Sequence, residues 1–219
     1  MADGFSGKIK QKLIEAKQKW AENGRLLTGQ ADHAHENRLP PGQREVKDWP
    51  VLDLGITPHV GTDEFRLTID GEVENPVTLD FSQLLDLPPF MAKNDIHCVT
   101  SWSRYDNHWQ GVSALSLADL VKPTSDARHV LFTAHDGYTT NVRIDQFLDH
   151  DVLLAHHWED APLTEEHGGP VRVIIPKLYF WKSAKWVKQI TFSKIDKPGF
   201  WEVRGYHNNA DPWTEERYG

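Results

Sequence analysis

The residues best suited to chemistry lie around the single cysteine of the chain. The stretch 94–109, NDIHCVTSWSRYDNHW, contains Cys98 and places histidine, serine and arginine side chains close to it. A thiolate is a nucleophile and a ligand for soft metals, whereas a buried thiol packs as a small apolar group. His97 is a poor base for activating this cysteine, because adjacent residues of a strand point to opposite faces. Metal binding and core packing therefore remain the two main interpretations of Cys98.

A second feature is a segment without acidic residues in a chain whose net charge is −8. Between positions 167 and 195 there is no Asp or Glu, and the cations are Arg172, Lys177, Lys182, Lys185, Lys188 and Lys194. The sequences Gly-Gly at 168–169 and KSAK at 182–185 add accessible backbone N–H groups. Cations and backbone donors together are what a phosphate group requires. The spacing alone fits a solvated strand face with outward lysines equally well.

Other kinds of site receive little support. The sequence lacks GxGxxG after a strand, GxxxxGK[ST], HExxH and CxxC. The pairs His33/His35 and His156/His157 could bind zinc, but no further ligands recur near them at the usual spacing. One cysteine excludes an internal disulfide. The acidic net charge argues against non-specific binding to nucleic acid or to anionic membranes.

The elements that must position these residues are short strands and short helices. Four strands are expected, two from alternation and two from buried apolar runs: 65–69, 186–192, 129–133 and 171–175. Asp80 and Ser116 are expected to cap two short helices that end before Pro88 and Pro123. Such a pattern predicts an α+β fold with mostly antiparallel or mixed sheets.

The chain is expected to divide into an N-terminal arm with a linker, residues 1–47, and one domain, residues 48–219. Apolar residues recur at helical spacing at Ile9, Leu13, Ala16 and Trp20. Gly24 ends this amphipathic helix, and the Pro-Pro-Gly sequence at 40–42 interrupts the polar linker. We expect the helix to pack on its own domain. No signal-peptide pattern or membrane-length apolar run is present, so the expected location is cytoplasmic.

The segment IHCVTSWS around Cys98 resembles the cysteine loop of the sulfite oxidase family of molybdenum enzymes. The similarity continues in the same order through WQGV at 109–112, GGPVRVIIP at 168–176 and KSAKWVKQI at 182–190. It covers about residues 49–192, and its combined motifs are highly specific. With the tail GYHNNADPW, the chain looks most like the short bacterial sulfite oxidase-like oxidoreductases.

This resemblance implies a molybdopterin-binding α+β domain in which a pterin dithiolene and one protein thiolate, here Cys98, hold molybdenum. The related protein-methionine-sulfoxide reductases imply further cofactor contacts at Thr133, Ala134, His167, Arg172, Ser183, Ala184 and Lys185. Arg172 and Lys185 would neutralise the pterin phosphate. A looser match to the same relatives implies that the stretch 48–53 also contacts the cofactor. Arg104, the first cation after Cys98 in the sequence, is the candidate for a catalytic role.

The resemblance also implies an activity, namely two-electron oxygen-atom transfer on a small sulfur-containing substrate. Electrons would pass through a separate partner, since the chain has no segment for a haem or an iron–sulfur cluster. Sulfite oxidases follow the cysteine with an arginine-rich loop, whereas this chain has VTSW at 99–102, so sulfite is not carried over as substrate. Two alternatives stay open: a cofactor carrier without turnover, and a degenerate domain in which Cys98 is structural.

Overall fold

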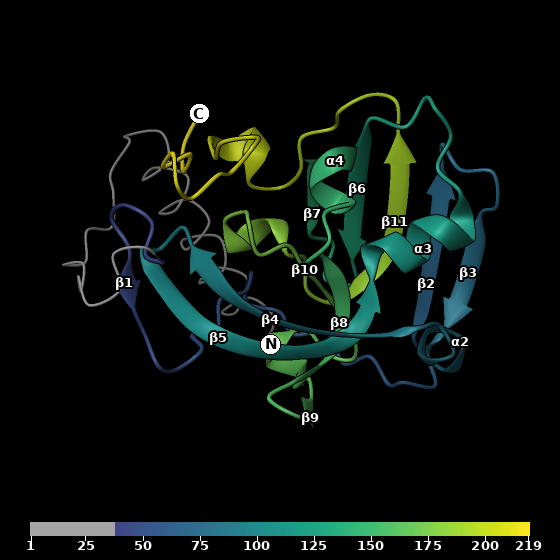
Figure 1. Ribbon diagram of the computed structural model, residues 1–219, viewed down its shortest axis with the longest axis horizontal. Coiled ribbons are helices and arrows are strands. Elements are labelled where there is room, and N and C mark those ends of the chain that lie inside the picture. The colour runs from purple at the N-terminus through teal and green to yellow at the C-terminus, as the bar shows by residue number, and fades with distance from the viewer. Residues whose placement is uncertain (1–37) are drawn as a thin grey trace, which may run out of the picture.

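Two β-sheets form the body of the molecule in the computed structural model (Figure 1). The structure describes residues 38–219, so the predicted helix near the N-terminus lies outside the described residues. The six-stranded sheet runs in the order β1-β5-β8-β10, with β4 paired to β5 and β9 paired to β8. Its strands are β1 (Arg44–Glu45), β4 (Pro89–Cys98), β5 (Trp102–Ser113), β8 (Leu153–Trp158), β9 (Ala161–Pro162) and β10 (Arg172–Ile174).

The second sheet is five-stranded and runs in the order β3-β2-β11-β6-β7. Its strands are β2 (Arg66–Gly71), β3 (Val77–Asp80), β6 (His129–Ala134), β7 (Thr139–Arg143) and β11 (Val187–Ser193). Strand β11 pairs in parallel with β2 and antiparallel with β6. Both sheets are therefore mixed, because β1 also pairs in parallel with β5. The four strands expected from the sequence all form, with ends that differ by at most two residues.

The described helices are few and short, and the fold is mostly β. The α-helices are α2 (Phe81–Leu85), α3 (Ala114–Val121) and α4 (Ile144–Phe147), and the 3₁₀ turns are η2 (Glu165–His167), η3 (Phe180–Lys182) and η4 (Glu202–Arg204). Asp80 caps α2 as predicted, in a capping box with Gln83. The predicted cap of α3 is wrong. Ser113, at the extended end of β5, accepts the N–H of Ser116, because a cap residue needs non-helical backbone angles.

The long hairpin of β4 and β5 curves along one side of the molecule and carries Cys98 at its tip (Figure 1). Cys98 is the last residue of β4 and is opposite Trp102, the first residue of β5. Ser101 closes the connection in a left-handed conformation, with φ of 67°. We call residues 98–101 the Cys98 loop. Strand β1 lies beside this loop, since Arg44 is in register with Trp102.

Gly111 in the WQGV motif is required by the close approach of β5 to β8. A Cβ atom there would lie 2.0 Å from the Leu154 carbonyl oxygen and 2.8 Å from the Ala155 Cα. We expect Gly111→Ala to lower the free energy of unfolding by about 3 kcal/mol, because the backbone of β8 must move. Urea unfolding of the cofactor-free protein measures this loss.

Gly137 provides a control for this substitution. It has φ of +84°, and a Cβ there would meet nothing within 4 Å. Gly137→Ala should therefore cost only about 1 kcal/mol, the backbone term alone. If Gly111→Ala lost no more than Gly137→Ala, the interpretation of Gly111 as a packing requirement would be wrong.

Within the part of the chain that the structure describes, no helix combines the length and the apolar character needed to cross a membrane.

Candidate functional site

A cavity beside the Cys98 loop gathers residues that are distant in the sequence. Its lining includes Cys98 from the end of β4, His167 from η2 and Arg172 from β10. The segment after η3 adds three consecutive residues, Ser183, Ala184 and Lys185. The loosely matched stretch 48–53 also reaches the cavity, through Trp49, Pro50, Leu52 and Asp53. Most of the residues named from the sequence therefore share one concave site.

Thr133 and Ala134 do not belong to this lining. Ala134 is fully buried in β6, in register with Val187 of β11. The residues that reach the cavity from this part of the chain are Asp136 and Tyr138, just beyond the end of β6. Cofactor contacts at Thr133 and Ala134 therefore stay predictions, and neither residue lines the cavity.

Arg104 also lies outside the cavity lining. Its guanidinium donates to Asn107, to Glu159 Oε1 at 3.2 Å and, through Nε, to the Lys47 carbonyl at 3.1 Å. It also stacks over the Trp158 ring at 4.7 Å. These contacts direct the Arg104 side chain from β5 toward the turn after β8. The structure does not bring its guanidinium to the Cys98 sulfur. Its catalytic role stays a prediction without geometric support.

Cys98 lies at an aromatic end of the cavity. Its residue is 6% exposed, and Sγ is 3.1 Å from Thr100 Oγ1. Trp201 and Tyr206, from the segment after β11, line the same cavity. The pKa of Tyr206 is raised, mainly by burial and further by Tyr218 and Cys98, so its hydroxyl stays protonated at neutral pH. Sequence reasoning missed Trp201 and Tyr206; the only signal was the aromatic content of the tail.

His97 does not serve as a base for Cys98. Its Nδ1 lies 2.8 Å from Ser103 Oγ, and the ring does not line the cavity. Burial lowers the pKa of His97 to about 4, so the ring is neutral at physiological pH. The geometry agrees with the expectation from strand alternation.

Arg172 provides a buried cation on another wall. The residue is 3% exposed, and its two Nη atoms donate to the carbonyls of His167 and Ser183 at 2.7 and 2.9 Å. Its guanidinium lies over the rings of Phe180 and Trp49, at 4.4 and 5.2 Å. Its Nε is buried without a hydrogen-bond partner. Burial lowers the pKa of Arg172 to about 9, because desolvation disfavours the charged guanidinium.

Lys185 and His167 complete this wall. Lys185 donates to the Glu166 carbonyl at 2.8 Å, and burial followed by the nearby Arg172 charge lowers the pKa of Lys185 to about 8. The His167 ring stacks on Trp49 with centroids 3.9 Å apart and planes at 9°. Burial, followed by the charges of Arg172 and Lys185, lowers the pKa of His167 to about 4. A flat neutral ring thus lies beside two cations.

These cations fit an anionic ligand. Among residues 38–219, neither Arg172 nor Lys185 forms an ion pair with a carboxylate. A buried cation is costly unless an opposite charge compensates it, and the Nε of Arg172 has an unused donor. The cavity therefore offers a soft sulfur ligand together with a positively charged binding surface.

A family model described as the oxidoreductase molybdopterin binding domain matches residues 54–201. The chain belongs to this family. It is a molybdopterin oxidoreductase of the sulfite oxidase family, as the resemblance of its motifs predicts. The cation wall and the thiol of the cavity both lie within the matched residues, and both suit a phosphorylated pterin that carries a soft metal.

Two sequence relatives and one solved structure are similar to this chain. The chain is 44% identical over 192 residues to the uncharacterized oxidoreductase YuiH of Bacillus subtilis, which covers 87% of this chain and 96% of YuiH. It is 30% identical to the protein-methionine-sulfoxide reductase catalytic subunit MsrP of Burkholderia mallei, over 71% of this chain and 56% of MsrP. The sulfane dehydrogenase SoxCD from Paracoccus pantotrophus shares the fold, with a TM-score of 0.61 at 19% identity, over 72% of this chain and 46% of that chain.

The charge of Lys185 predicts a pH dependence of anion binding to the cofactor-free protein. Sulfate stays a dianion across the range, and the protonated amine attracts it. Sulfate binding should be constant between pH 6 and about pH 7 and should weaken as Lys185 loses its proton around its pKa of about 8. Above that pH the affinity should fall by up to roughly tenfold per pH unit. Tryptophan fluorescence can follow the titration, because Trp186 lies under Lys185 at 4.3 Å.

The variant Lys185→Met tests the assignment of this pH dependence. It should bind sulfate more weakly at pH 7 and show no further decline between pH 7 and 8.5. A decline of the same size in this variant would assign the titration to another group.

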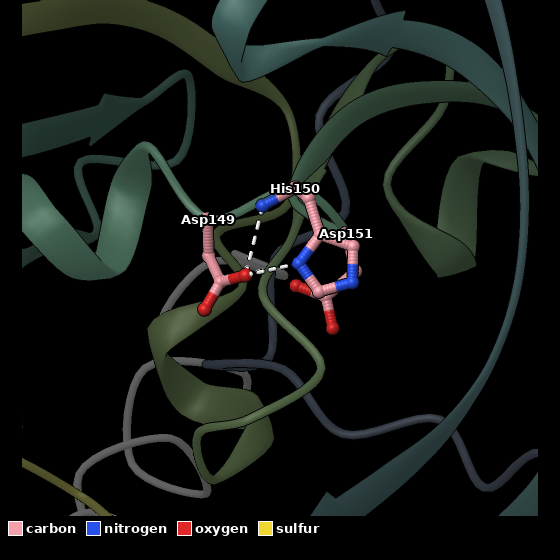
Figure 2. Close-up of side chains that lie close together, drawn as sticks. All are labelled: Asp149, His150 and Asp151. Carbon is pink, nitrogen blue, oxygen red and sulfur yellow. Dashed lines mark hydrogen bonds and ion pairs between the residues drawn. The ribbon is translucent and has the colours of Figure 1, made fainter.

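The other clusters of possible metal ligands within residues 38–219 do not form a comparable site. Figure 2 shows the backbone N–H and the ring of His150 directed at the Asp149 carboxylate, at 2.8 and 2.6 Å, with Asp151 beside them. Asp149 also pairs with Lys177 at 2.5 Å, so its oxygens are already engaged. The rings of His156 and His157 face each other through Nδ1, and no third ligand joins them among the described residues. His33 and His35 lie outside the described residues.

Proposed function

We propose that the chain is a molybdenum cofactor-dependent oxidoreductase in which the Cys98 thiolate is the metal ligand. The reaction proposed is two-electron oxygen-atom transfer on a small sulfur-containing compound. The observation that carries this proposal is the presence of Cys98, Arg172 and Lys185 in the lining of one cavity. When bound, the molybdenum cofactor supplies the two-electron redox chemistry.

The residues of the chain have distinct tasks in this proposal. Arg172 and Lys185 bind the phosphate, and Ser183 and Ala184 lie between them on the same wall. His167, held flat against Trp49, offers a neutral hydrogen-bonding edge to the pterin. Cys98 fixes the metal end. Each task is proposed from the charge or the shape of a side chain that lines the cavity.

The substrate is proposed to approach the aromatic end, next to Thr100, Trp201 and Tyr206. These side chains exclude water and offer hydroxyl groups, but no charge. Arg104 is held elsewhere by Glu159. A binding site for the sulfite dianion would need cations, so this arrangement favours a substrate other than sulfite.

A second candidate function is that of a cofactor carrier or binding module without turnover. The absence of a cation among the described residues that line the sulfur end supports it, because a carrier needs only the phosphate-binding wall. In the catalytic case a separate electron-transfer partner is proposed. The expected cytoplasmic location stays a prediction.

One preparation can test both functions. The full chain is produced in a host that makes molybdenum cofactor, and molybdenum and pterin are measured in the purified protein. Protein with intact Cys98 but neither component would overturn the proposal. The loaded protein is then assayed with sulfite and small sulfoxides, using artificial electron donors and acceptors. Bound cofactor without turnover of any substrate would favour the carrier.

A further inference from the structure

Two segments outside the matched domain meet at the Cys98 loop. The family model covers residues 54–201, yet residues 38–49 precede it and residues 202–219 follow it. Gln43, from the first segment, is fully buried and donates from Nε2 to the Cys98 carbonyl at 3.0 Å. Its Oε1 lies 3.4 Å from the Ser103 hydroxyl. The buried amide of Gln43 therefore holds the backbone of Cys98, the candidate metal ligand.

Arg217, from the second segment, acts on the next residue of the loop. It is 1% exposed, and its Nη1 donates to the Val99 carbonyl at 2.8 Å. Its Nη2 donates to the Pro41 carbonyl at 3.2 Å, and its guanidinium lies over the Tyr179 ring at 4.8 Å. One buried guanidinium therefore joins the C-terminal tail, the N-terminal segment and the Cys98 loop.

Three of the four carbonyls of this loop accept hydrogen bonds from outside the hairpin. The Cys98 carbonyl accepts from the Gln43 side chain, and the Val99 carbonyl accepts from the Arg217 side chain. The Ser101 carbonyl accepts the backbone N–H of Arg44 at 3.1 Å. The turn itself contributes one backbone hydrogen bond across it, from Ser101 N–H to the Cys98 carbonyl at 3.0 Å. Ser101 occupies a left-handed conformation that is unfavourable for a residue with a side chain. Because an unfavourable turn persists only when its surroundings enforce it, these outside contacts determine where the sulfur lies.

We propose that Gln43 and Arg217 are positioning residues that hold Cys98 in the orientation required of a metal ligand. Neither residue lines the cavity, so they act through the Cys98 loop and not on the cofactor. This inference rests on the proposed function insofar as Cys98 is taken as the ligand. It adds that the segments 38–49 and 202–219 act on the site also through residues that do not line the cavity.

The single cysteine makes the proposal directly testable in the cofactor-free protein, because any thiol reaction reports on Cys98. The variants are Arg217→Met and Gln43→Leu, and the reagent is the uncharged 4,4′-dithiodipyridine at one pH. Both variants should react at least roughly tenfold faster than the parent, since the loop opens locally. The rate should depend little on low urea concentrations, because local opening exposes little surface.

Arg204→Met is the matched control. Arg204 lies in the same tail and makes the same kinds of contact, to the Phe200 carbonyl at 2.7 Å and over the Phe200 ring at 3.8 Å. Its loss should leave the thiol reaction rate unchanged within about twofold, the range expected for a site without shared partners. Gln43→Leu keeps the proposal testable if Arg217→Met does not fold.

In cofactor-loaded protein, the two variants should also shift the thiolate-to-molybdenum absorption band relative to the parent. Unchanged thiol rates in both variants, or faster rates with the urea dependence of global unfolding, would overturn the inference and leave only a structural role. An unshifted band in loaded variants would do the same. A parent protein without molybdenum would overturn the proposed function instead, and the thiol rates would still decide whether Gln43 and Arg217 hold the loop.

Discussion

Replacing Cys98 with serine is expected to abolish the thiolate-to-molybdenum absorption and to lower turnover by more than about 100-fold, the upper loss seen for outer-shell partners of a metal. Serine matches cysteine in size, but its hydroxyl stays protonated at neutral pH and is a hard ligand. No other described residue can supply sulfur to the cavity, because Met91 is 73% exposed on β4 and does not line it. Absorption spectra, metal analysis and pterin analysis of the purified variant measure the outcome.

Loss of the sulfur and loss of the buried cation should have different effects on the pterin content. Cys98→Ser leaves Arg172 and Lys185 in place, so pterin should remain bound although the absorption is lost. Arg172→Met removes the buried cation proposed to hold the phosphate, so both the pterin and the absorption should be lost, because the pterin dithiolene carries the metal. Thr100→Val, which removes the hydroxyl 3.1 Å from Sγ, serves as a control and should keep both pterin and absorption. Persistence of the absorption in Cys98→Ser would exclude this sulfur as the ligand.

Local features of the fold could be predicted from the sequence because their causes are local. Asp80 caps α2 through Gln83, three residues away, and a pattern of that length can be read directly. The cap at Ser113 was missed because two serines three residues apart compete for the position, and the end of β5 decides between them. The motif residues Cys98, Arg172 and Lys185 could be identified because each stands in a sequence stretch with its own signature.

Residues that depend on distant partners could not be found in this way. Arg104 was assigned a role from its closeness to Cys98 in sequence, but Glu159, 55 positions away, draws it elsewhere. Arg217 contacts Val99 across 118 positions, and no spacing rule anticipates such a contact. Tyr206 reaches the cavity only because the tail folds back over η3, where the Tyr179 N–H donates to the Ala210 carbonyl. Side chains that complete a site from remote segments therefore require the structure.

The largest loss of stability is expected from Glu202→Leu. Glu202 and Lys182 form an ion pair at 2.7 Å whose side chains are 1% and 0% exposed. Glu202 Oε1 also accepts hydrogen bonds from Thr140 and Trp181, at 2.8 and 3.0 Å. Burial lowers the pKa of Lys182, and the charge of Glu202 opposes that change. Removing the carboxylate leaves a buried ammonium without a counter-charge, which should cost about 3–5 kcal/mol of unfolding free energy.

This pair also joins two parts of the cavity wall, because Lys182 precedes Ser183 and Glu202 follows Trp201. The double variant Lys182→Met/Glu202→Leu replaces both charges by apolar groups and should recover most of the stability that Glu202→Leu loses. Urea unfolding of the two variants and the parent measures the difference. If the double variant were as unstable as Glu202→Leu, the loss would come from the hydrogen bonds of Thr140 and Trp181 and not from an uncompensated charge. A Glu202→Leu variant as stable as the parent would show that Lys182 finds another partner or is neutral in the fold.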